Sequence, residues 1–395
     1  MKERLHILVL DGGAERSPAI MRALKERNAR LTLGVGRGSV SPAAASRYPD
    51  DVVRHPPLQP GHEFLAFLQD LVRNSAVDVV LPLQDEALIA LQSYRAELER
   101  IVPLAAPPAD CVASALDKAV TVARARRVTD GLATPATIMP DTAAEAVEAW
   151  TGRFPVVVKP RVGTGAEGIR LARDENELAR VFELVSRQYP RPLVQEHIEY
   201  LPGEKFILLY LFDDRRELRS WYCQRIFLDK KSLRMGVDRE RTRGGVALLW
   251  ETHEDLNLMR RGRVLLEALG WSGLAVIDCA RDRRDGRYYL FEINARLNGS
   301  STQALRRGPN FAYDSCLVAL HRPLACHLDF AQGCRARNGP LTMLDAREWR
   351  SILGLLDPRF SPPIPILLDP APLVWETVRL VRKRLPRSKQ LRREA

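Results

Sequence analysis

Three polar side chains alternate over residues 292–296, where Glu292, Asn294 and Arg296 are separated by Ile293 and Ala295. Successive side chains of an extended strand point to opposite faces of a sheet, so the carboxylate, the amide and the guanidinium would share one face. Carboxylate and amide oxygens are ligands of hard divalent cations, and the planar guanidinium pairs with anionic oxygens. The pattern therefore predicts a site for a divalent cation and attached phosphates.

A second carboxylate lies where it could join this group. Residues 273–280 and 287–293 have the apolar composition of strands, and residues 281–286 have that of a turn. A three-residue loop with Gly286 in the left-handed conformation would place Asp278 opposite Glu292, with the two carboxylates about 5 Å apart. Like charges that close are unfavourable unless a cation lies between them. The sequence leaves the register open, and a solvated hairpin face is the alternative.

A lysine and a glycine-rich loop form the second group of candidates. Lys159 ends an apolar segment, and Gly163, Gly165 and Gly168 follow it. A lysine there can contact a phosphate, while glycines let backbone N–H groups approach phosphate oxygens. The loop has neither the Walker order nor the dinucleotide fingerprint, because no helix opens directly after it. A flexible hairpin turn is the alternative for the loop taken alone.

Three more features fit a nucleotide. Lys118 offers a second cation, residues 195–198 end a strand whose backbone could meet an adenine edge, and Glu204 follows a Pro-Gly turn and could accept from ribose hydroxyls. Each has a plain alternative, since Lys118 could be a surface lysine and Glu204 a turn carboxylate. Their order along the chain, ahead of the cation-binding segment, favours an ATP–Mg²⁺ site.

At this point the sequence resembles the ATP-grasp superfamily, in the branch of biotin carboxylase and the carbamoyl-phosphate synthetase large chain. The resemblance covers about residues 1–325. It is carried by Leu116-Asp117-Lys118, Val156-Val157-Val158-Lys159-Pro160 with the glycine loop, Val194-Gln195-Glu196-His197-Ile198, Pro202-Gly203-Glu204, and Asp278 with Phe291-Glu292-Ile293-Asn294-Ala295-Arg296.

The resemblance implies a role for each candidate that contacts nucleotide. Lys118 and Lys159, with the glycine loop, would contact the phosphates of ATP. Glu196 and Ile198 would form the adenine-binding hinge. Glu204 would reach the ribose.

The resemblance also implies the metal site and the reaction. Asp278, Glu292 and Asn294 would hold Mg²⁺ or Mn²⁺, and Arg296 would be the catalytic contact to an acyl phosphate or to the substrate anion. The enzyme would activate a carboxylate as an acyl phosphate with ATP, and an amine would then attack. No covalent nucleophile is needed, so the protein supplies positioning and charge neutralisation.

Two departures from the family pattern bear on the substrate. Ala295 stands where the family often has proline, and residues 298–301 read Asn-Gly-Ser-Ser, unlike the Gln-Val-Glu-His of biotin carboxylases. These differences favour a small carboxylate and an amine as substrates. A bicarbonate-using carboxylase or carbamoyl-phosphate-type enzyme is one alternative, and a non-catalytic ATP-binding regulatory protein is another.

Alternating strands and helices predict an α/β architecture with a parallel, doubly wound sheet at the N-terminus. The resemblance implies that residues 1–110 are a Rossmann-like pre-ATP-grasp domain and that 111–325 have an ATP-grasp fold, with a lid at about 130–195 and an antiparallel α+β subdomain. Residues 326–395 are expected to be a proline-rich linker and a basic helix or tail. Apolar spacing predicts strands over 5–10, 31–35, 77–83, 154–160, 193–198 and 205–212, and helices over 18–27, 63–74, 85–100, 116–129, 175–186, 257–269 and 373–385.

Composition limits the class of protein. The six cysteines are scattered without a CxxC pair, and no secretory signal or membrane-spanning run is present, which favours a cytoplasmic enzyme. The net charge of +11 could suggest nucleic acid. However, eight Lys or Arg and two Glu over residues 371–395 supply +6 of it, and no nucleic-acid-binding motif occurs.

Two basic segments remain without a firm role. The predicted helix over 373–385 carries apolar residues beside arginines, and it could contact an anionic membrane surface peripherally or dock on its own domain. Residues 230–243 are also basic. We expect a solvated loop there rather than a contact to an anionic substrate. The oligomeric state is not legible from the sequence.

Overall fold

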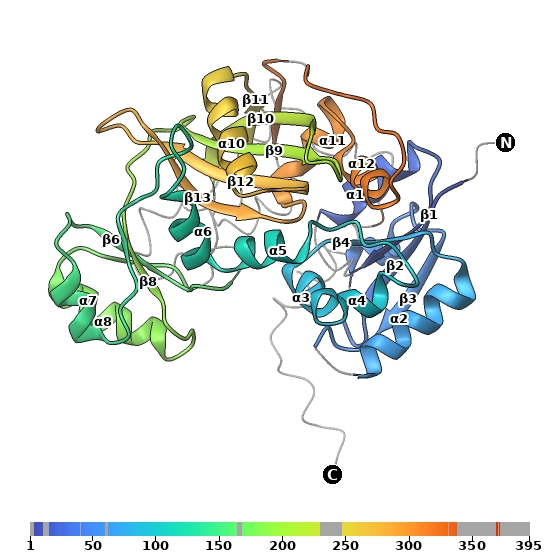
Figure 1. The fold of residues 1–395 in the computed structure, drawn as a ribbon, viewed down its shortest axis with the longest axis horizontal. Coiled ribbons are helices and arrows are strands. Elements are labelled where there is room, and N and C mark those ends of the chain that lie inside the picture. The colour runs from blue at the N-terminus through green and yellow to red at the C-terminus, as the bar shows by residue number, and fades with distance from the viewer. Residues whose placement is uncertain are drawn as a thin grey trace, which may run out of the picture.

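The structure is a computed structural model that describes residues 4–10, 16–39, 41–59, 62–163, 168–229, 247–330, 332–337, 369 and 371. Figure 1 shows three sheets, each with its own set of helices. The glycine Gly165, the basic segment 230–243 and the predicted helix 373–385 lie outside the described residues. No helix in the described ranges has the length and apolar composition to cross a membrane.

The first sheet is parallel, as its alternating pattern predicts. Its strands run in the order β3-β2-β1-β4. All five residues of β1 are buried, which is the pattern of a central parallel strand covered on both faces. The elements are β1 (His6–Leu10), α1 (Ser17–Lys25), β2 (Arg30–Gly36), η1 (Pro42–Ala45), β3 (Asp51–His55), α2 (His62–Ser75), β4 (Val79–Pro82), α3 (Asp85–Ser93) and α4 (Arg95–Leu98).

The helix predicted over 85–100 is interrupted at Tyr94, which separates α3 from α4 with a non-helical backbone. The helix predicted over 116–129 is shorter than expected, since α6 (Lys118–Ala125) begins after its cap Asp117. The helix α5 (Ala109–Leu116), which ends at Asp117, was not predicted. The start of α6 matters for the candidate site, because it makes Lys118 the first residue of a helix.

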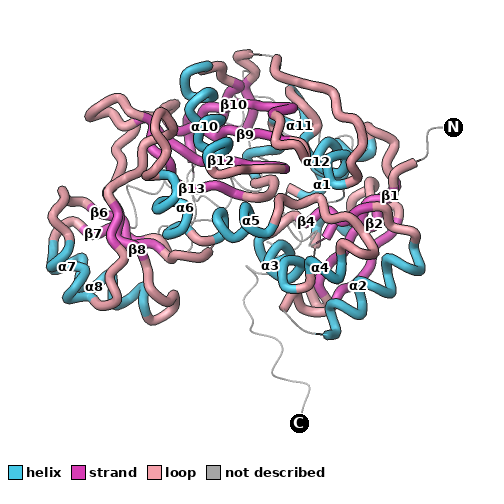
Figure 2. Tube along the Cα trace, in the orientation of Figure 1, coloured by secondary structure: helices cyan, strands magenta, loops and turns pink. Residues whose placement is uncertain are grey.

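The second sheet is antiparallel and small, in the order β5-β8-β6-β7. It packs with its two helices around a separate apolar core that includes Trp150, Leu178 and Phe182. Figure 2 shows this unit set apart at one side of the molecule. Its elements are β5 (Thr137–Ile138), α7 (Ala143–Ala149), β6 (Val156–Lys159), β7 (Arg170–Ala172), α8 (Glu175–Ser186) and β8 (Leu193–Glu196).

The largest sheet has six strands in the order β13-β12-β9-β10-β11-β14, with antiparallel pairing throughout. Strands β10, β11 and β14 were not expected from the sequence. Its elements are β9 (Lys205–Phe212), β10 (Leu218–Asp229), β11 (Ala247–Thr252), α10 (Leu256–Ala268), β12 (Gly273–Arg281), β13 (Tyr288–Asn294), η2 (Gly299–Thr302), α11 (Ala304–Arg307), α12 (Phe311–Ala319) and β14 (Arg335–Arg337).

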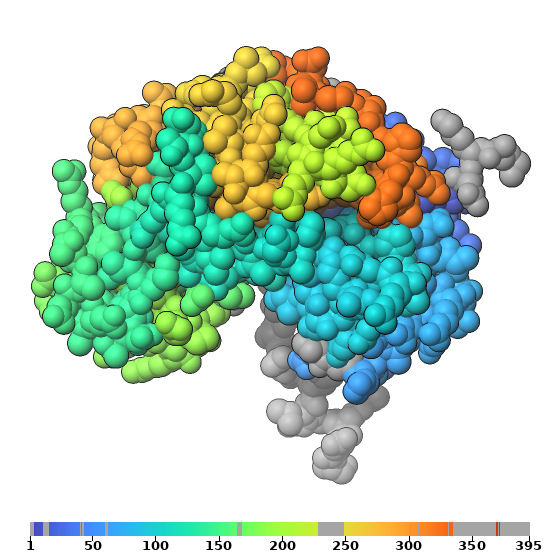
Figure 3. Space-filling model, in the orientation of Figure 1, coloured from blue at the N-terminus to red at the C-terminus, as the bar shows by residue number. Residues whose placement is uncertain are grey.

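The first and third sheets share one apolar core. It joins Ile7 and Leu33 of the parallel sheet to Leu209 and Val276 of the antiparallel sheet through Phe311 of α12. The small antiparallel sheet has no part in this cluster. The first and third sheets therefore share one core, and the small sheet packs on a core of its own. Figure 3 shows a recess between the lobe of the small sheet and the lobe of the first sheet, with α5 and α6 above it in this view.

Candidate active site

A bulge in the β12–β13 hairpin brings the two predicted carboxylates together. Near the turn the register pairs Cys279 with Leu290, and it then shifts so that Asp278 pairs with Glu292. Phe291 is the extra residue. Directly opposite residues project to the same face, so the predicted pairing of Asp278 with Glu292 is confirmed. The three-residue loop from which it was predicted is wrong, because Arg281 pairs with Tyr288 and the bulge alone brings Glu292 opposite Asp278. Gly286 has a φ of 71°, the left-handed conformation that the turn prediction required.

The two carboxyl groups are in unlike electrostatic states. Burial, followed by the negative charge of Glu292, raises the pKa of Asp278 well above its usual range. Burial also acts to raise the pKa of Glu292, but the charge of Lys118, a hydrogen bond from Asp278 and the charge of Lys159 together lower it. Asp278 therefore favours its protonated form and Glu292 its carboxylate form, since two negative charges so close together oppose each other.

Two lysines face this pair from different elements. Lys118 Nζ lies 3.7 Å from Glu292 Oε2 and donates to Gly163 O at 2.8 Å. Lys159 Nζ donates to Phe291 O at 3.4 Å. A bulged residue is left out of the strand ladder, which leaves the Phe291 carbonyl available to this lysine. Burial and the charge of Lys118 lower the pKa of Lys159 to about 7, against the opposing effect of Glu292.

The start of α6 is held in place by an ion pair. Asp117 caps the helix by accepting from Ala119 N at 2.9 Å, and both of its oxygens accept from Arg161 Nε at 2.7 Å. The Lys118 backbone N–H donates to Arg161 O at 3.0 Å. These contacts tie the end of β6 to the first residue of α6. They fix Lys118 and the strand that carries Lys159 relative to each other.

Two of the predicted loop glycines are described, and their backbone explains their identity. Gly163 has a φ of 152° and Gly168 one of 74°, a region that side chains rarely allow. A Cβ on Gly168 would lie 2.6 Å from both Pro160 Cγ and Tyr189 Cε2. Gly163 also contributes the carbonyl that Lys118 contacts. The two described ends of the loop thus have backbone conformations that favour glycine.

Asn294 and Arg296 lie beside the carboxylates, as the alternation predicted. Asn294 Nδ2 donates to Glu292 Oε1 at 3.4 Å. Arg296 is buried, and its charge acts on Asp278 and Glu292. Its guanidinium makes a bidentate ion pair with Asp85, with Nε and Nη2 at 2.6 and 2.7 Å from the carboxylate oxygens. The sequence analysis did not anticipate this partner from the first sheet.

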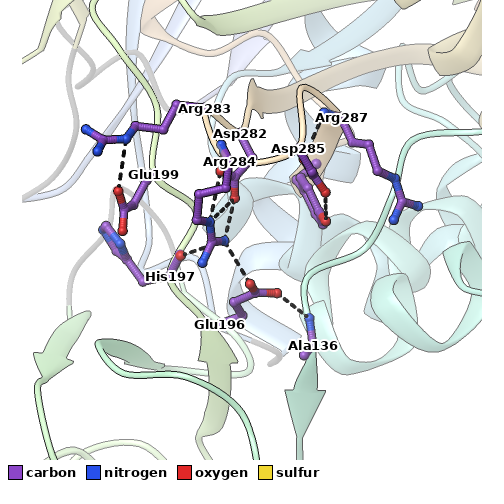
Figure 4. A network of polar contacts seen from close by, with 10 residues as sticks. Ala136, Glu196, His197, Glu199, Asp282, Arg283, Arg284, Asp285 and Arg287 are labelled. Carbon is purple, nitrogen blue, oxygen red and sulfur yellow. Dashed lines mark hydrogen bonds and ion pairs between the residues drawn. The ribbon is translucent and has the colours of Figure 1, made fainter.

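The predicted adenine hinge lies between β8 and β9, and the turn of the β12–β13 hairpin packs on it. Figure 4 shows Arg284 of this turn reaching Glu196, at 2.8 Å, and contacting Asp282 and the His197 carbonyl as well. Glu204 is tied to the same hairpin, since its carbonyl accepts from Arg281 N at 2.8 Å. Ile198 is buried between these two points. The side chain of Glu196 is therefore anchored, and its backbone N–H donates to Ala136 O at 2.8 Å.

The carboxylate pair fits a divalent cation. Asp278 Oδ1 is buried and has no hydrogen-bond partner among the described residues, which is costly for a carboxyl oxygen without a ligand. No group of three or more His, Cys, Asp or Glu side chains in those residues could enclose a metal by itself. Two carboxylates and one amide suit a cation that takes its other oxygens from phosphates and water, as Mg²⁺ does.

Comparison with known proteins agrees with this geometry. Residues 115–300 match the family model for the ATP-grasp domain. This part of the chain is an ATP-grasp domain. The matched range begins just before Lys118 and ends just after Arg296, so it encloses the predicted site residues. A search of curated protein sequences finds no match.

Solved structures share the fold at low sequence identity. A biotin carboxylase from Campylobacter jejuni has a TM-score of 0.65 and 14% identity over 84% of this chain and 74% of its own. An N5-carboxyaminoimidazole ribonucleotide synthetase has a TM-score of 0.66 and 14% identity over 87% and 84%. An L-amino acid ligase from Bacillus licheniformis has 0.59 and 17% over 82% and 76%. The α/β fold with an ATP-grasp domain is therefore established.

Two residues at the ATP-grasp site escaped the sequence analysis. Asp85 opens α3 directly after β4, and ligand sites of parallel sheets form at the carboxyl ends of strands. That position was the signal that could have identified it. Lys205, the first residue of β9, acts on Asp278 through its charge. In the sequence, only the position of Lys205 directly after Glu204 could have indicated it.

Proposed function

We propose that this protein is an ATP-dependent, ADP-forming ligase that activates a carboxylate as an acyl phosphate and joins it to an amine. We further propose the division of the chain into residues 1–110, 111–325 with a lid at about 130–195, and 326–395. The single observation that carries the proposal is the pair Asp278–Glu292 on one sheet face, with Lys118 and Lys159 directed at the same spot. Two acids and two lysines suit a cation bound to the phosphates of a nucleotide.

The two lysines would act on the phosphates. A carboxylate is a poor electrophile, because its leaving group would be oxide. Transfer of the γ-phosphoryl group to it gives a phosphate leaving group, and the negative charge on the transferring oxygens must be balanced. Lys118 projects from a helix start fixed by Asp117, and Lys159 projects from the end of β6. Charges held in place before the reaction avoid the cost of reorganisation.

The cation site is proposed to consist of Asp278, Glu292 and Asn294. Mg²⁺ or Mn²⁺ would supply Lewis-acid neutralisation of the phosphate oxygens when bound. Ligation requires the carboxylate form. Asp278 would therefore give up the proton that its raised pKa retains in the metal-free protein.

Arg296 is the proposed contact to the acyl phosphate or the substrate anion. A guanidinium has five N–H donors. Arg296 uses Nε and one Nη2 hydrogen on Asp85 and one Nη1 hydrogen on Leu297 O, at 3.4 Å. Two donors remain for an anionic oxygen. Asp85 would thus orient the arginine rather than block it.

The nucleotide base is proposed to lie at the hinge between β8 and β9. The backbone of Glu196 and Ile198 would meet the adenine edge, and the half-buried carboxylate of Glu204 would accept from the ribose. Gly163, Gly165 and Gly168 would let the lid loop approach the phosphates. Closure of such a lid excludes water, which would otherwise hydrolyse an acyl phosphate.

The proposal is tested by measuring phosphate and ADP release from ATP and Mg²⁺ with a panel of carboxylic acids, each with and without a panel of amines. We expect release that requires both partners, and hydroxylamine should trap a hydroxamate of the activated acid. Release that depends on bicarbonate and on no amine would contradict ligation and identify a carboxylase-type reaction. ATP binding without release for any pair would contradict catalysis.

A further inference from the structure

A cavity lies at the end of α6 that is opposite to the proposed ATP site. It has a volume of about 450 Å³. It is lined by the end of α6, the segment 128–134 that leads into the lid, the start of α10 and the β12–β13 turn. Lys118 is the first residue of α6 and Arg126 is its C-cap. At about 1.5 Å per helical residue the two positions are roughly 12 Å apart, and none of the proposed site residues lines this cavity.

Three arginines give the cavity a positive charge. Arg126, Arg261 and Arg287 line it together with a single acid, Asp130. None of these four residues forms an ion pair within the described part of the chain. On the same hairpin turn, by contrast, Arg283 and Arg284 each reach a carboxylate, at 3.2 and 2.8 Å. The three cavity arginines converge without such neutralisation.

The contacts that the three arginines make within the protein use few of their hydrogen-bond donors. Arg126 Nη2 donates to Thr137 O at 3.0 Å, and Arg261 Nη1 donates to Gly131 O at 3.3 Å. The Arg287 guanidinium carbon lies 5.6 Å from the centre of the Tyr289 ring. Figure 4 shows the Arg287 side chain extending away from Asp282 and Glu196. Since a guanidinium has five donors, most of them remain available at this cavity.

The helix dipole accounts for only one of the three arginines. A cation at the C-terminus of a helix is stabilised by the dipole, and this explains Arg126. Arg261 is the sixth residue of α10, away from both ends of that helix, and Arg287 precedes a strand. Arg261 and Arg287 are therefore brought to the same cavity as Arg126 without a helix end that would account for their charge.

We propose that this cavity binds a small oxyanion with several negative charges, of the phosphate-ester or polycarboxylate class. Guanidinium groups match the geometry of both phosphate and carboxylate by bidentate hydrogen bonds. The volume lies in the range of about 300–1,000 Å³ that small-molecule sites occupy. Asp130 and Asn257 also line the cavity and could pair with a hydroxyl or amino group of such a ligand.

Two of these arginines, Arg126 and Arg261, also contact the segment that leads into the proposed lid. Their acceptors, the carbonyls of Gly131 and Thr137, flank a short stretch that pairs with β13 through Ala133, whose N–H donates to Tyr288 O at 2.9 Å. An anion that draws Arg126 and Arg261 together would brace this connection. Occupancy of the cavity should therefore reduce the opening of the segment 131–137 and couple to lid motion.

The test is calorimetric titration of the full-length protein, with its nucleotide site saturated by ADP and Mg²⁺. The probes are inorganic phosphate, glycerol 3-phosphate and citrate. We expect saturable binding of at least one probe, and at least about a tenfold loss of affinity in Arg261→Met/Arg287→Met. The control is Arg263→Met, which changes an exposed α10 arginine paired with Glu267 outside the cavity. Arg261→Lys/Arg287→Lys keeps the positive charges but loses the bidentate hydrogen bonding of the guanidinium groups. Its affinity for the probe should therefore lie between those of the wild type and the double Met variant.

Hydrogen exchange gives a second readout. The bound probe should slow exchange of residues 131–137 in the wild type and in Arg263→Met, but not in the double Met variant. Absence of saturable binding by all three probes, or equal binding by the wild type and the double Met variant, would overturn the proposal. Phosphate and citrate both binding would indicate charge recognition, and only one of them binding would identify the oxyanion class.

Discussion

The proposed chemistry depends on one extra residue in a strand. Without the bulge at Phe291, continuation of the register from Cys279–Leu290 would place Phe291 opposite Asp278. The bulge instead places Glu292 there and frees the Phe291 carbonyl for Lys159. One backbone irregularity therefore builds both the carboxylate pair and the contact of the buried lysine. Bulges are common next to active sites because they redirect side chains in this way.

Neutralising either carboxylate should abolish most turnover while leaving the fold intact. We expect Glu292→Gln and Asp278→Asn each to lower the rate by roughly 10²–10³-fold, the usual cost of removing one electrostatic contact to developing charge. Asp278 already retains a proton in the metal-free protein, so Asp278→Asn replaces one neutral side chain by another and its melting temperature in the absence of metal should not fall. Asp285→Asn is the matched control, because Asp285 pairs with Tyr289 in the turn. Full turnover in both site variants would contradict the assignment.

The lowered pKa of Lys159 predicts a pH dependence of nucleotide binding. In the free protein the pKa of this lysine is about 7. A neighbouring phosphate favours the ammonium form, so the pKa is higher in the complex. Above pH 7, binding must therefore take up a proton, and affinity should fall as pH rises to about 9, by up to about tenfold per unit. Below pH 7 the lysine is already charged, and its titration should have no effect.

Calorimetry with a nonhydrolysable ATP analogue from pH 7.5 to 9 measures this slope. Lys159→Met should bind more weakly and with a smaller pH dependence. If the variant keeps the wild-type slope, another group is responsible for it.

At the scale of elements, short connections fix the positions of the two lysines and the hinge. Asp117 stops α5, starts α6 and holds Arg161, which follows the strand that ends at Lys159. Arg284 joins the β12–β13 turn to the hinge residue Glu196. In both places a charged side chain makes a contact that would be lost by substitution of one residue.

Removing the cap at Asp117 should affect both stability and nucleotide binding. Asp117→Ala loses an N-cap worth about 0.5–2 kcal/mol, and it frees Arg161. We expect the free energy of unfolding to fall by about that amount in chemical denaturation, and ATP-analogue affinity to fall because Lys118 is no longer fixed. Asp117→Asn keeps a capping oxygen and should recover most of the stability. A loss of stability without any change in affinity would contradict the positioning role.

The turn arginines offer a matched pair of substitutions. Arg284→Met would leave the buried Asp282 without its ion-pair partner, which costs about 1–3 kcal/mol for an unsatisfied buried group. It would also release Glu196 and loosen the hinge. Arg283→Met removes only an ion pair with Glu199 between exposed residues, so its cost should be at most about 1 kcal/mol. Equal stability of the two variants would show that the turn does not anchor the hinge.

At the scale of the whole molecule, one ion pair connects the first sheet to the site. Asp85 at the start of α3 and Arg296 beyond β13 are 211 residues apart and both largely buried. The shared apolar core keeps the two sheets in one body, so this pair can hold its geometry. Residues of the first sheet thereby take part in a site that the ATP-grasp domain mostly supplies.

Breaking this pair should leave Arg296 misplaced and uncompensated. Asp85→Asn keeps the shape but removes the charge. We expect the turnover number to fall more than the ATP-analogue affinity, because Arg296 is proposed to contact the acid substrate or its acyl phosphate and not the nucleotide base. A matched control is Glu86→Gln on the same helix turn, which forms no ion pair within the described residues. An equal loss of nucleotide affinity and turnover in Asp85→Asn would contradict this division of roles.

The sequence predicted the elements and chemistry that depend on local pattern. Alternation along residues 292–296 and the apolar strand that ends at Lys159 could be inferred from neighbouring residues. The pairing of Asp278 with Glu292 was predicted from a three-residue turn, but the bulge at Phe291 produces it. That bulge, the helix α5 and the partners Asp85 and Arg284 were not predicted. The two partners depend on contacts between residues distant in the chain, and apolar spacing across Tyr94 concealed the break between α3 and α4. Residue types identified the candidate site, and tertiary packing decided its partners.

The most direct test is the structure of the protein crystallised with Mg²⁺ and a nonhydrolysable ATP analogue. The account predicts a cation bridging the terminal phosphates, with oxygens of Asp278 and Glu292 coordinating it directly at about 2.0–2.1 Å and Lys118 and Lys159 on the phosphates. A cation bound without either carboxylate, or an analogue whose phosphates lie away from both lysines, would contradict it.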